Sequence, residues 1–330
     1  MTMSKDGKAN FFNLFSPLFE YYIGISSYSF WDITFYLQNI LLYIPFLVAF
    51  NIIEQLTTVG GTHSMQTATV TIVVPTYNKA KFILKTLDSI RNQTYSNWEL
   101  LIIDDHSTDK TVSIVKENLD SKKEKIIVRK KNEGICHVMN EALQYVKSKY
   151  FIQVDGDDWL SPETLEVLVN RMEKEPPSTA LAYANCTHWH YKQGKNHFHK
   201  IVKAKTFKNR YEFVTHSGMV FPRFYRTACV RKVGGWAIDK LTNGKLLEDR
   251  RMLLRLLDEY KFVYVDRNLY HYCYHGNNLS HPKNAKLYNK LVKDFTDQAL
   301  HRWGNDYRAE YSVPSHWLRI RLIPLKKGGQ

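Results

Sequence analysis

The sequence has few cysteines, and no two of them are spaced to share a metal ion. The four cysteines among its 330 residues are Cys136, Cys186, Cys229 and Cys273, and none forms a Cys-x-x-Cys pair. This spacing argues against a thiolate zinc site and against a disulfide framework. We therefore expect a protein of a reducing compartment, with the cytoplasm as its location.

Lysine and arginine are absent between Lys8 and Lys79, although the whole chain has 46 of them and a formal net charge of +14. The first 66 residues therefore differ in composition from the rest, and we predict an N-terminal extension there. The basic excess of the remaining chain favours an anionic partner. Nucleic acid, an acidic membrane surface and a phosphorylated substrate all satisfy that requirement.

The sequence also lacks an uninterrupted apolar run long enough to cross a membrane as one helix. Its most apolar stretch, residues 37–53, contains Gln38, Asn39, Asn51 and a central Pro45, whereas a spanning helix needs about 20 apolar residues. No small-residue cleavage pattern follows, so a secretory signal is not predicted. The extension is either helices that pack on the main domain or a partner, or a monotopic attachment to the inner face of the plasma membrane.

Strand and helix patterns alternate after residue 66. Short β-branched or apolar runs predict strands over residues 69–74, 98–103, 125–128 and 150–154, and helical spacing predicts helices near residues 82–90, 112–119 and 135–146. This alternation predicts an α/β fold whose mainly parallel sheet is joined by right-handed crossovers. Ligands bind to such sheets at the carboxyl ends of the strands.

Three polar clusters follow predicted strands, over residues 75–78, 104–109 and 155–158. The last one, Asp155-Gly156-Asp157-Asp158, places three carboxylates within four residues, and their repulsion is relieved by a hard divalent cation such as Mg²⁺ or Mn²⁺. The alternative is a solvated turn before a helix that Asp158 or Ser161 caps.

The Asp104-Asp105 pair also ends a predicted strand. A carboxylate in this place can accept a hydrogen bond from the ring N–H of a uracil or similar base. The alternative is that Asp104 or Ser107 is a turn or cap residue.

Together these segments resemble the family 2 glycosyltransferases that have a GT-A fold, notably the bacterial spore-coat and polysaccharide types. The order and spacing match at residues 71–78 (TIVVPTYN), 102–109 (IIDDHSTD), 132–134 (NEG) and 155–158 (DGDD). The resemblance is specific over about residues 68–170 and looser to about 280. It implies a Rossmann-like GT-A sheet, mixed but mainly parallel and flanked by helices, with an N-terminal helical extension.

The resemblance also implies roles for particular residues. The donor-binding set would be Pro75, Thr76, Tyr77, Asp105, Asp155 and Gly156, with Asp105 on the nucleobase. Asp157 would be the direct ligand of Mn²⁺ or Mg²⁺, with Asp155 beside it. That ion would bridge the two phosphates of a nucleotide sugar, most simply a UDP-sugar.

One departure from the family pattern concerns the diphosphate. Where the family often has Ala-Arg-Asn, this chain has Val138-Met139-Asn140. His137, Lys79 or a downstream arginine, or the metal alone, would have to replace the missing arginine.

The resemblance implies that an acidic pair before an apolar helix supplies the catalytic base. Glu248-Asp249 fits this description, with Asp249 as the base and Glu248 as the next choice. A carboxylate base without a covalent nucleophile implies an inverting transfer. The alternative is that both acids favour the first turn of a helix and pair with Arg251 or Arg255.

Several aromatic and histidine residues have less specific patterns. Trp236 either stacks on a sugar or anchors the core, and His271, His275 or His281 is a candidate to complete the metal shell. Residues 192–195 predict a hairpin turn flanked by four histidines, His188, His190, His197 and His199. These either hold zinc or, more commonly for such a pattern, are solvated.

The predicted organisation is an extension over 1–66, a nucleotide-sugar half over 67–180, an acceptor and catalytic half over 181–290 and a basic tail over 291–330. Residues 316–327 are either an interfacial membrane element or a terminal strand. The resemblance implies hexosyl or acetylhexosaminyl transfer from UDP to a cell-wall glycan, polymer or lipid-linked acceptor, or to a peptide. Alternatives from other classes are a nucleic-acid-binding α/β protein, for which no recognised motif is present, and an inactive sugar-nucleotide sensor.

Overall fold

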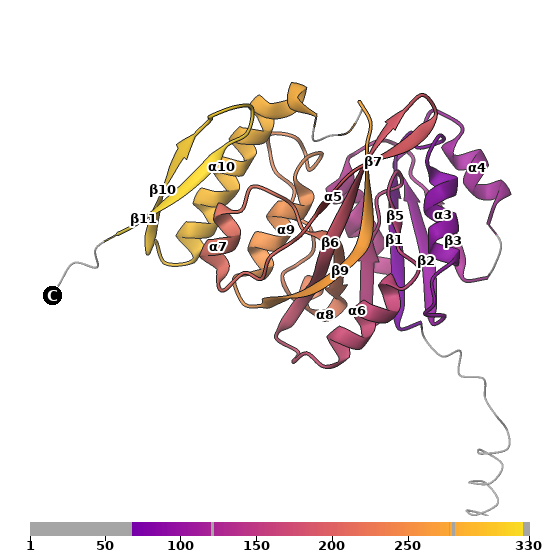
Figure 1. Ribbon diagram of the computed structural model, residues 1–330, viewed down its shortest axis with the longest axis horizontal. Coiled ribbons are helices and arrows are strands. Elements are labelled where there is room, and N and C mark those ends of the chain that lie inside the picture. The colour runs from indigo at the N-terminus through magenta and orange to yellow at the C-terminus, as the bar shows by residue number, and fades with distance from the viewer. Residues whose placement is uncertain (1–67, 120–121, 277, 279–280, 326–330) are drawn as a thin grey trace, which may run out of the picture. The chain divides into compact units, whose positions relative to one another are not determined.

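Residues 68–119, 122–276, 278 and 281–325 are the part of the chain that the computed structural model describes (Figure 1). The predicted extension over 1–66, with both of its interpretations, lies outside this part, as does the end of the predicted tail from residue 326. The described residues form one compact unit.

A nine-stranded mixed sheet organises this unit, in the order β3-β2-β1-β4-β8-β6-β9-β5, with β7 paired to β6. Its strands are β1 (Val70–Thr76), β2 (Trp98–Asp104), β3 (Glu124–Val128), β4 (Tyr150–Gln153), β5 (Trp159–Leu160), β6 (Thr179–Lys192), β7 (Lys195–Val202), β8 (Phe221–Arg226) and β9 (Lys261–Tyr274). The first four strands are parallel to one another, and β8 runs antiparallel to both β4 and β6. The predicted α/β fold with a mixed, mainly parallel sheet is confirmed.

Helices follow the strands as the alternating pattern predicts. They are α3 (Ile83–Arg91), α4 (Thr111–Glu117), α5 (Ile135–Tyr145), α6 (Thr164–Glu173), α7 (Arg210–Thr215), α8 (Thr227–Lys232), α9 (Glu248–Leu256), a 3₁₀ turn at Pro282–Asn284 and α10 (Ala285–Arg302). The described residues contain no helix that is both long and apolar enough to cross a membrane.

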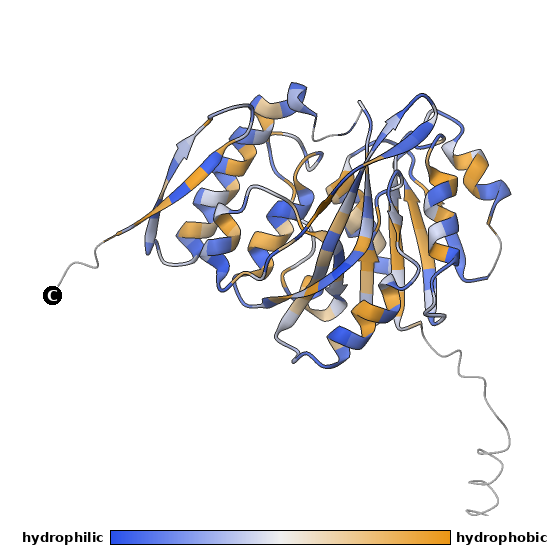
Figure 2. Cartoon of the chain, viewed as in Figure 1, coloured by the Kyte–Doolittle hydropathy of each residue, from blue (hydrophilic) through white to orange (hydrophobic). Residues whose placement is uncertain are grey.

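The strands are buried on both faces because two apolar cores flank the sheet. Val70, Ile72 and Val74 of β1 pack with the apolar residues of α3 and α6, whereas Val73 packs in the second core with residues of α5 and α9. This two-sided burial explains why β1 is a continuous apolar run with no alternation. Figure 2 shows the hydrophobic colour gathered in the central strands.

The carboxyl ends of β1 and β2 are level, since Thr76 pairs with Asp104 in their register. Thr76 Oγ1 donates to Asp104 Oδ2 at 2.9 Å, and the Ser107 backbone N–H donates to Asp104 Oδ1 at 2.8 Å. Asp104 is fully buried. Because it accepts the Ser107 N–H three residues later, it is the turn residue of the alternative interpretation. Its contacts hold the first two polar loops side by side.

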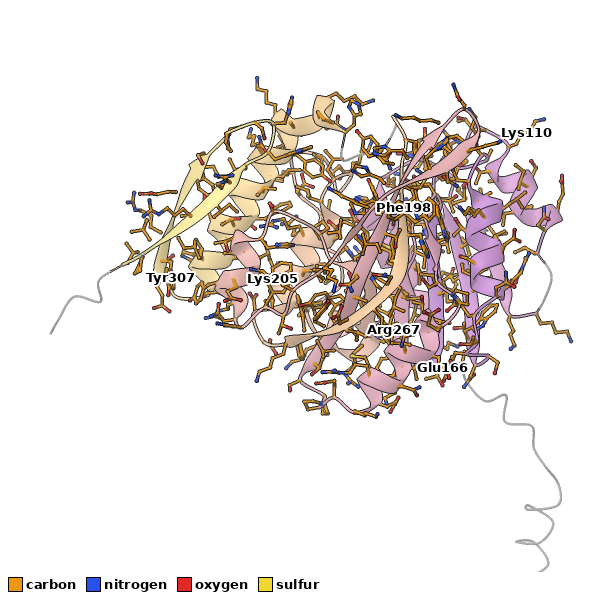
Figure 3. All side chains as sticks on the ribbon, viewed as in Figure 1. Lys110, Glu166, Phe198, Lys205, Arg267 and Tyr307 are labelled. Carbon is orange, nitrogen blue, oxygen red and sulfur yellow. The ribbon has the colours of Figure 1, made fainter. Side chains whose placement is uncertain are left out.

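The C-terminal part folds back as α10 and a hairpin of β10 (Tyr307–Ser312) and β11 (Arg319–Pro324). Tyr307, labelled in Figure 3, packs on Tyr211 of α7 with ring centroids 4.5 Å apart. Of the two interpretations for the tail, the terminal strand is confirmed over residues 319–324.

The loop before α9 is attached to the start of α5 at one glycine. The Cys136 backbone N–H donates to the Gly244 carbonyl at 3.0 Å. Gly244 has a φ of +74°, and a Cβ at this position would lie 2.7 Å from the Cβ of Cys136. A side chain here is therefore excluded both by the left-handed backbone and by the neighbouring helix.

We predict that Gly244→Ala lowers the free energy of unfolding by about 3 kcal/mol, since backbone strain and overpacking add. Urea unfolding measures the loss. Gly194→Ala is the matched control, because Gly194 has a similar φ of +78° and a Cβ added there would meet no atom within 4 Å. It should lose only about 1 kcal/mol, and equal losses in the two variants would contradict the packing argument.

Candidate active site

A cavity of ≈ 660 Å³ opens at the carboxyl ends of the strands. The nine predicted site residues all line it: Pro75, Thr76, Tyr77, Asp105, Asp155, Gly156, Asp157, Glu248 and Asp249. The structure thus brings together loops that follow β1, β2 and β4 with the first turn of α9. Asp105 and Asp157 share one cavity, as a common binding site for one ligand requires.

Asp105 holds the segment that contains residues 132–134. Its Oδ1 lies 2.7 Å from Arg129 Nη1, and its Oδ2 accepts from the Gly134 backbone N–H at 2.8 Å. Only 4% of Asp105 is exposed. The contacts from Arg129 and from the Gly134 backbone N–H fix the carboxylate at the cavity wall and set its orientation.

Asp158 attaches the acidic loop to β9. Its Oδ1 accepts from the Cys273 backbone N–H at 2.7 Å, and its Oδ2 accepts from the Tyr270 hydroxyl at 2.8 Å. Burial, together with the charges of Asp157 and Asp155, raises the pKa of Asp158 well above its ordinary value. The helix cap predicted for Asp158 or Ser161 is wrong, because α6 begins after Glu163 with no side-chain cap.

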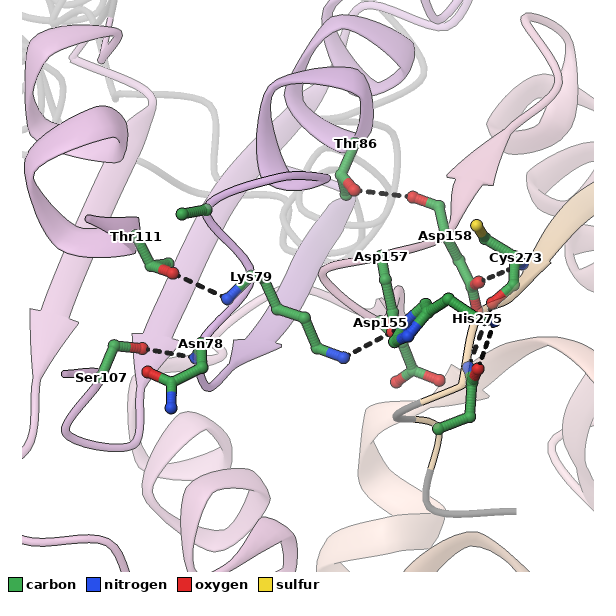
Figure 4. A network of polar contacts seen from close by, with 12 residues as sticks. Asn78, Lys79, Thr86, Ser107, Thr111, Asp155, Asp157, Asp158, Cys273 and His275 are labelled. Atoms are coloured by element: carbon green, nitrogen blue, oxygen red, sulfur yellow. Dashed lines mark hydrogen bonds and ion pairs between the residues drawn. The ribbon is translucent and has the colours of Figure 1, made fainter. Parts of the chain in front are cut away.

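Asp157 lies between a lysine and a histidine (Figure 4). Its Oδ2 is 2.5 Å from Lys79 Nζ and 2.7 Å from His275 Nε2. Burial would raise the pKa of Asp157, but the Lys79 charge and the bond from His275 outweigh it and lower the pKa to about 2. The His275 ring stacks on Phe82 with centroids 4.6 Å apart, which fixes the imidazole beside the carboxylate.

Asp157 and His275 together offer a carboxylate oxygen and an imidazole nitrogen, a donor set that suits Mn²⁺. Within the described ranges no three His, Cys, Asp or Glu side chains are grouped to hold a metal. Two protein ligands are nevertheless enough for an ion that takes its remaining ligands from phosphates and water. The residues therefore fit a metal that binds together with a diphosphate.

The other two histidines proposed for the metal shell lie elsewhere. His271 stacks on Trp159 at 5.2 Å and accepts from Trp189 Nε1 at 3.1 Å, while His281 Nδ1 accepts from the Lys283 backbone N–H. Of the three candidates, His275 is the one beside Asp157.

Arg223 of β8 connects the acidic loop to α9. Its Nη2 lies 3.0 Å from Asp155 Oδ2, and its Nη1 lies 2.9 Å from Asp249 Oδ2. The arginine is only 1% exposed, so these two carboxylates compensate its buried charge. Arg223 was not predicted from the sequence, although a cation inside the aromatic strand Phe221–Arg226 is the signal that could have identified it.

Glu248 and Asp249 form the first turn of α9, where the helix dipole favours negative charge. Burial and the charge of Asp249 raise the pKa of Glu248 to about 8. Burial also raises the pKa of Asp249, which the Arg223 charge opposes. Leu247, directly before the pair, has a φ of +56°, a strained conformation for a non-glycine residue at the cavity wall.

The alternative pairing of these acids with Arg251 or Arg255 is wrong. Arg251 Nη1 donates to the Ala237 carbonyl at 3.2 Å, and Arg255 donates to the carbonyls of Gly235 and Val233. Both arginines hold the loop that precedes α9, and Asp249 has Arg223 as its cation.

Position 139, where the family often has arginine, lies in an apolar core. Met139 is 1% exposed and packs in the cluster that contains residues of α5 and α9. Lys79 lines the cavity, whereas His137 is not among the described residues that do so. Of the substitutes considered for the missing arginine, Lys79 and the downstream Arg223 both line the cavity and contact the acidic loop.

The cavity also has a more apolar wall. It includes Met219, Phe221, Tyr272, Tyr288, Trp317 and Leu318. Tyr288 and Trp317 meet edge to face at 5.5 Å, and the Leu318 backbone N–H donates to Asn289 Oδ1 at 2.9 Å. This wall was not predicted from the sequence, since its residues come from elements far apart in the chain.

Trp236 is 2% exposed and packs on Phe151 and Tyr225, so the sugar-stacking role is wrong and the core anchor is confirmed. The hairpin at residues 192–195 is confirmed, with His190 opposite His197. His190 and His199 lie 4.6 Å apart. The described residues group no three metal ligands at this hairpin, and the zinc alternative stays an untested prediction.

Known proteins resemble this chain in sequence and in fold. GlyA of Streptococcus pneumoniae, a glycosyltransferase, is 26% identical over 69% of this chain and 34% of its own length. Hyaluronan synthase of Pasteurella multocida is 27% identical over 78% of this chain and 25% of its own length. The chain thus spans about a third or less of these relatives.

Two solved structures share the fold. S. aureus TarS 1–349 in complex with UDP-GlcNAc has a TM-score of 0.54 and 19% identity, covering 70% of each chain. The mannosyltransferase PcManGT of Pyrobaculum calidifontis, in complex with GDP-Man and Mn²⁺, has a TM-score of 0.52 and 17% identity, covering 71% of this chain and 64% of its own. The GT-A fold is confirmed.

The family model described as glycosyl transferase family 2 matches residues 71–234, which span β1 to the end of α8 and contain the three polar loops. The chain therefore belongs to glycosyl transferase family 2.

Proposed function

We propose that this chain transfers a sugar from a UDP-sugar to a hydroxyl of a glycan or polymer acceptor, with inversion at the anomeric carbon. The observation that carries the proposal is the single cavity lined by Asp105, Asp157 and the Glu248–Asp249 pair. Family membership favours this function over the nucleic-acid-binding alternative. The UDP-GlcNAc complex of TarS supports a UDP-linked donor, and the name of the hyaluronan synthase supports a polysaccharide product.

The donor binds along the acidic side of the cavity in this proposal. Asp105 accepts the ring N–H of the base, in the orientation that Arg129 and the Gly134 N–H give it. Pro75, Thr76 and Tyr77 line the base pocket. Asp155 and Gly156 lie next to the ribose. Asp157 and His275 would hold Mn²⁺ or Mg²⁺, which supplies positive charge for the leaving diphosphate.

Asp249 is the proposed general base. The acceptor oxygen attacks the anomeric carbon, the bond from that carbon to the phosphate oxygen breaks, and UDP leaves with the electron pair. The acceptor proton passes to Asp249, whose carboxylate Arg223 holds at 2.9 Å. Burial keeps the pKa of Asp249 above its ordinary value, which suits a group that must accept a proton.

The acceptor binds on the aromatic side of the cavity. Sugar rings present apolar C–H faces that pack on aromatic rings, and Tyr272, Tyr288 and Trp317 provide such rings. This wall favours a glycan or polymer chain over a peptide acceptor. A lipid-linked glycan presents the same sugar faces and belongs to the same proposal.

We predict that Asp157→Ala abolishes the part of the UDP affinity that depends on Mn²⁺, because His275 alone cannot retain the ion. Calorimetry measures the UDP affinity once with Mn²⁺ and once with EDTA, and the difference between the two affinities is the Mn²⁺-dependent part. Asp88→Ala is the control, since Asp88 is an exposed residue of α3 that is not among the described residues lining the cavity. A normal Mn²⁺-dependent gain in Asp157→Ala would exclude Asp157 as the ligand.

We predict that Asp249→Asn keeps the UDP affinity within about twofold but lowers turnover of a UDP-sugar by at least about 100-fold, the usual contribution of a general base. UDP release from a panel of UDP-sugars in Mn²⁺ measures turnover without a known acceptor. Retained turnover would move the base to Glu248. An unchanged biological output in cells that carry this variant would favour a sensor over an enzyme.

We predict that Glu248→Gln stabilises the protein at alkaline pH. The folded-state pKa of Glu248 is about 8, well above the ordinary 4.5, so the folded protein binds more protons than the unfolded chain between these values. The wild-type free energy of unfolding therefore falls as pH rises through this window.

The glutamine variant lacks this loss and should be about 2 kcal/mol more stable than wild type at pH 9, with little difference at pH 4. Urea unfolding in EDTA across this pH range measures both curves. Glu117→Gln, at an exposed position of α4, is the control and should follow the wild type. Parallel curves for Glu248→Gln and wild type would refute the raised pKa.

A further inference from the structure

Lys79 connects the loop after β1 to the acidic loop after β4 across the wall of the cavity (Figure 4). Its Nζ lies 2.5 Å from Asp157 Oδ2. The lysine side chain is 21% exposed, whereas that of Asp157 is 7% exposed. The cation is therefore in contact with the cavity, and the carboxylate is almost covered.

The backbone and stem of Lys79 are fixed by their neighbours. Its backbone N–H donates to Thr111 Oγ1 at 2.7 Å, and the Asn78 N–H donates to Ser107 Oγ at 2.8 Å. Its Cγ passes over Gly156, where an added Cβ would lie 3.3 Å away. The stem thus begins at a fixed point beside the acidic loop, and the ammonium can move by side-chain rotation alone.

The two arginines of the cavity wall are buried and already have partners. Arg223 is 1% exposed and pairs with two carboxylates, and Arg250 is 3% exposed and donates to the carbonyls of Val214 and His216. Lys245 packs against Gly134, whose backbone N–H donates to Asp105. Among the described residues of this wall, Lys79 is the cation placed to meet a diphosphate beside Asp157.

We propose that Lys79 exchanges partners when the donor binds: it neutralises Asp157 in the free protein and turns to the diphosphate oxygens once a divalent ion takes Asp157. This inference rests on the proposed function of the cavity. A divalent ion carries twice the charge of an ammonium and displaces it from the carboxylate. Lysine suits the exchange because its point charge sits on a flexible stem, unlike the planar fork of arginine.

The exchange gives the chain a phosphate-binding cation without an arginine at position 139. Free metal ions then compete with Lys79 for Asp157, and a bound diphosphate draws Lys79 away from that carboxylate. The metal and the diphosphate therefore favour each other's binding. Removing the ammonium should therefore have two effects of opposite sign. Binding of the metal alone should strengthen, and binding of the diphosphate without metal should weaken.

The test is calorimetry on the full chain with Lys79→Met, which keeps the length of the side chain and removes its charge. We expect the UDP affinity in EDTA to fall about tenfold, because Asp157 without its cation then repels the diphosphate. We expect the Mn²⁺ affinity without nucleotide to rise about fivefold, because Asp157 loses its competing cation. A misfolded variant would lose both affinities, so opposite changes exclude that explanation.

Lys81→Met is the matched control, since it removes one charge from an exposed position of the same loop and should leave both affinities within about twofold. Lys79→Arg keeps the charge and should keep most of the UDP affinity in EDTA. If the UDP affinity of wild type in EDTA is too low to measure, the Mn²⁺ titration decides alone.

An unchanged Mn²⁺ affinity in Lys79→Met would overturn the exchange, as would an unchanged UDP affinity. A wild-type protein that binds no UDP even with Mn²⁺ would instead refute the proposed function itself. The two failures are therefore distinguishable.

Discussion

The site depends on the buried ion pairs of Arg223 with Asp155 and Asp249. A buried guanidinium is costly unless carboxylates compensate it, and removing one partner of such a pair costs about 3–5 kcal/mol. The arginine therefore fixes the distance between the loop after β4 and the first turn of α9. In the proposed function these two segments hold the donor and the base, so one buried cation sets the geometry of the transfer.

The acidic residues around this arginine differ because their surroundings differ. Asp158 is buried among donors from β9 and serves to attach its loop, whereas Asp157 lies between Lys79 and His275. Asp249 pairs directly with Arg223, whereas Glu248 accepts from the amide of Gln153, and burial together with the charge of Asp249 raises the pKa of Glu248 to about 8. Neighbouring carboxylates thus acquire separate protonation behaviour without any change of residue type.

The cavity combines a part inside the family match with a part that follows it in the sequence. The acidic loops lie within residues 71–234, which the family model matches, whereas α9, α10 and the β10–β11 hairpin follow it in the sequence. Tyr288 and Trp317 come from these later elements and line the side proposed for the acceptor.

The sequence by itself predicted strands over 69–74, 98–103 and 150–154, which the structure has at 70–76, 98–104 and 150–153, and it predicted that their polar ends converge. Buried β-branched runs and turn residues are local signals, and parallel strands end at one edge of a sheet. The sequence also identified the acidic residues, but not their partners. Only the tertiary structure decided that Arg223 pairs with Asp155 and Asp249, that His275 rather than His271 or His281 lies at Asp157, and that Trp236 is buried in the core. These outcomes depend on contacts between residues tens to more than a hundred positions apart, and no periodicity or spacing in a single sequence encodes such contacts.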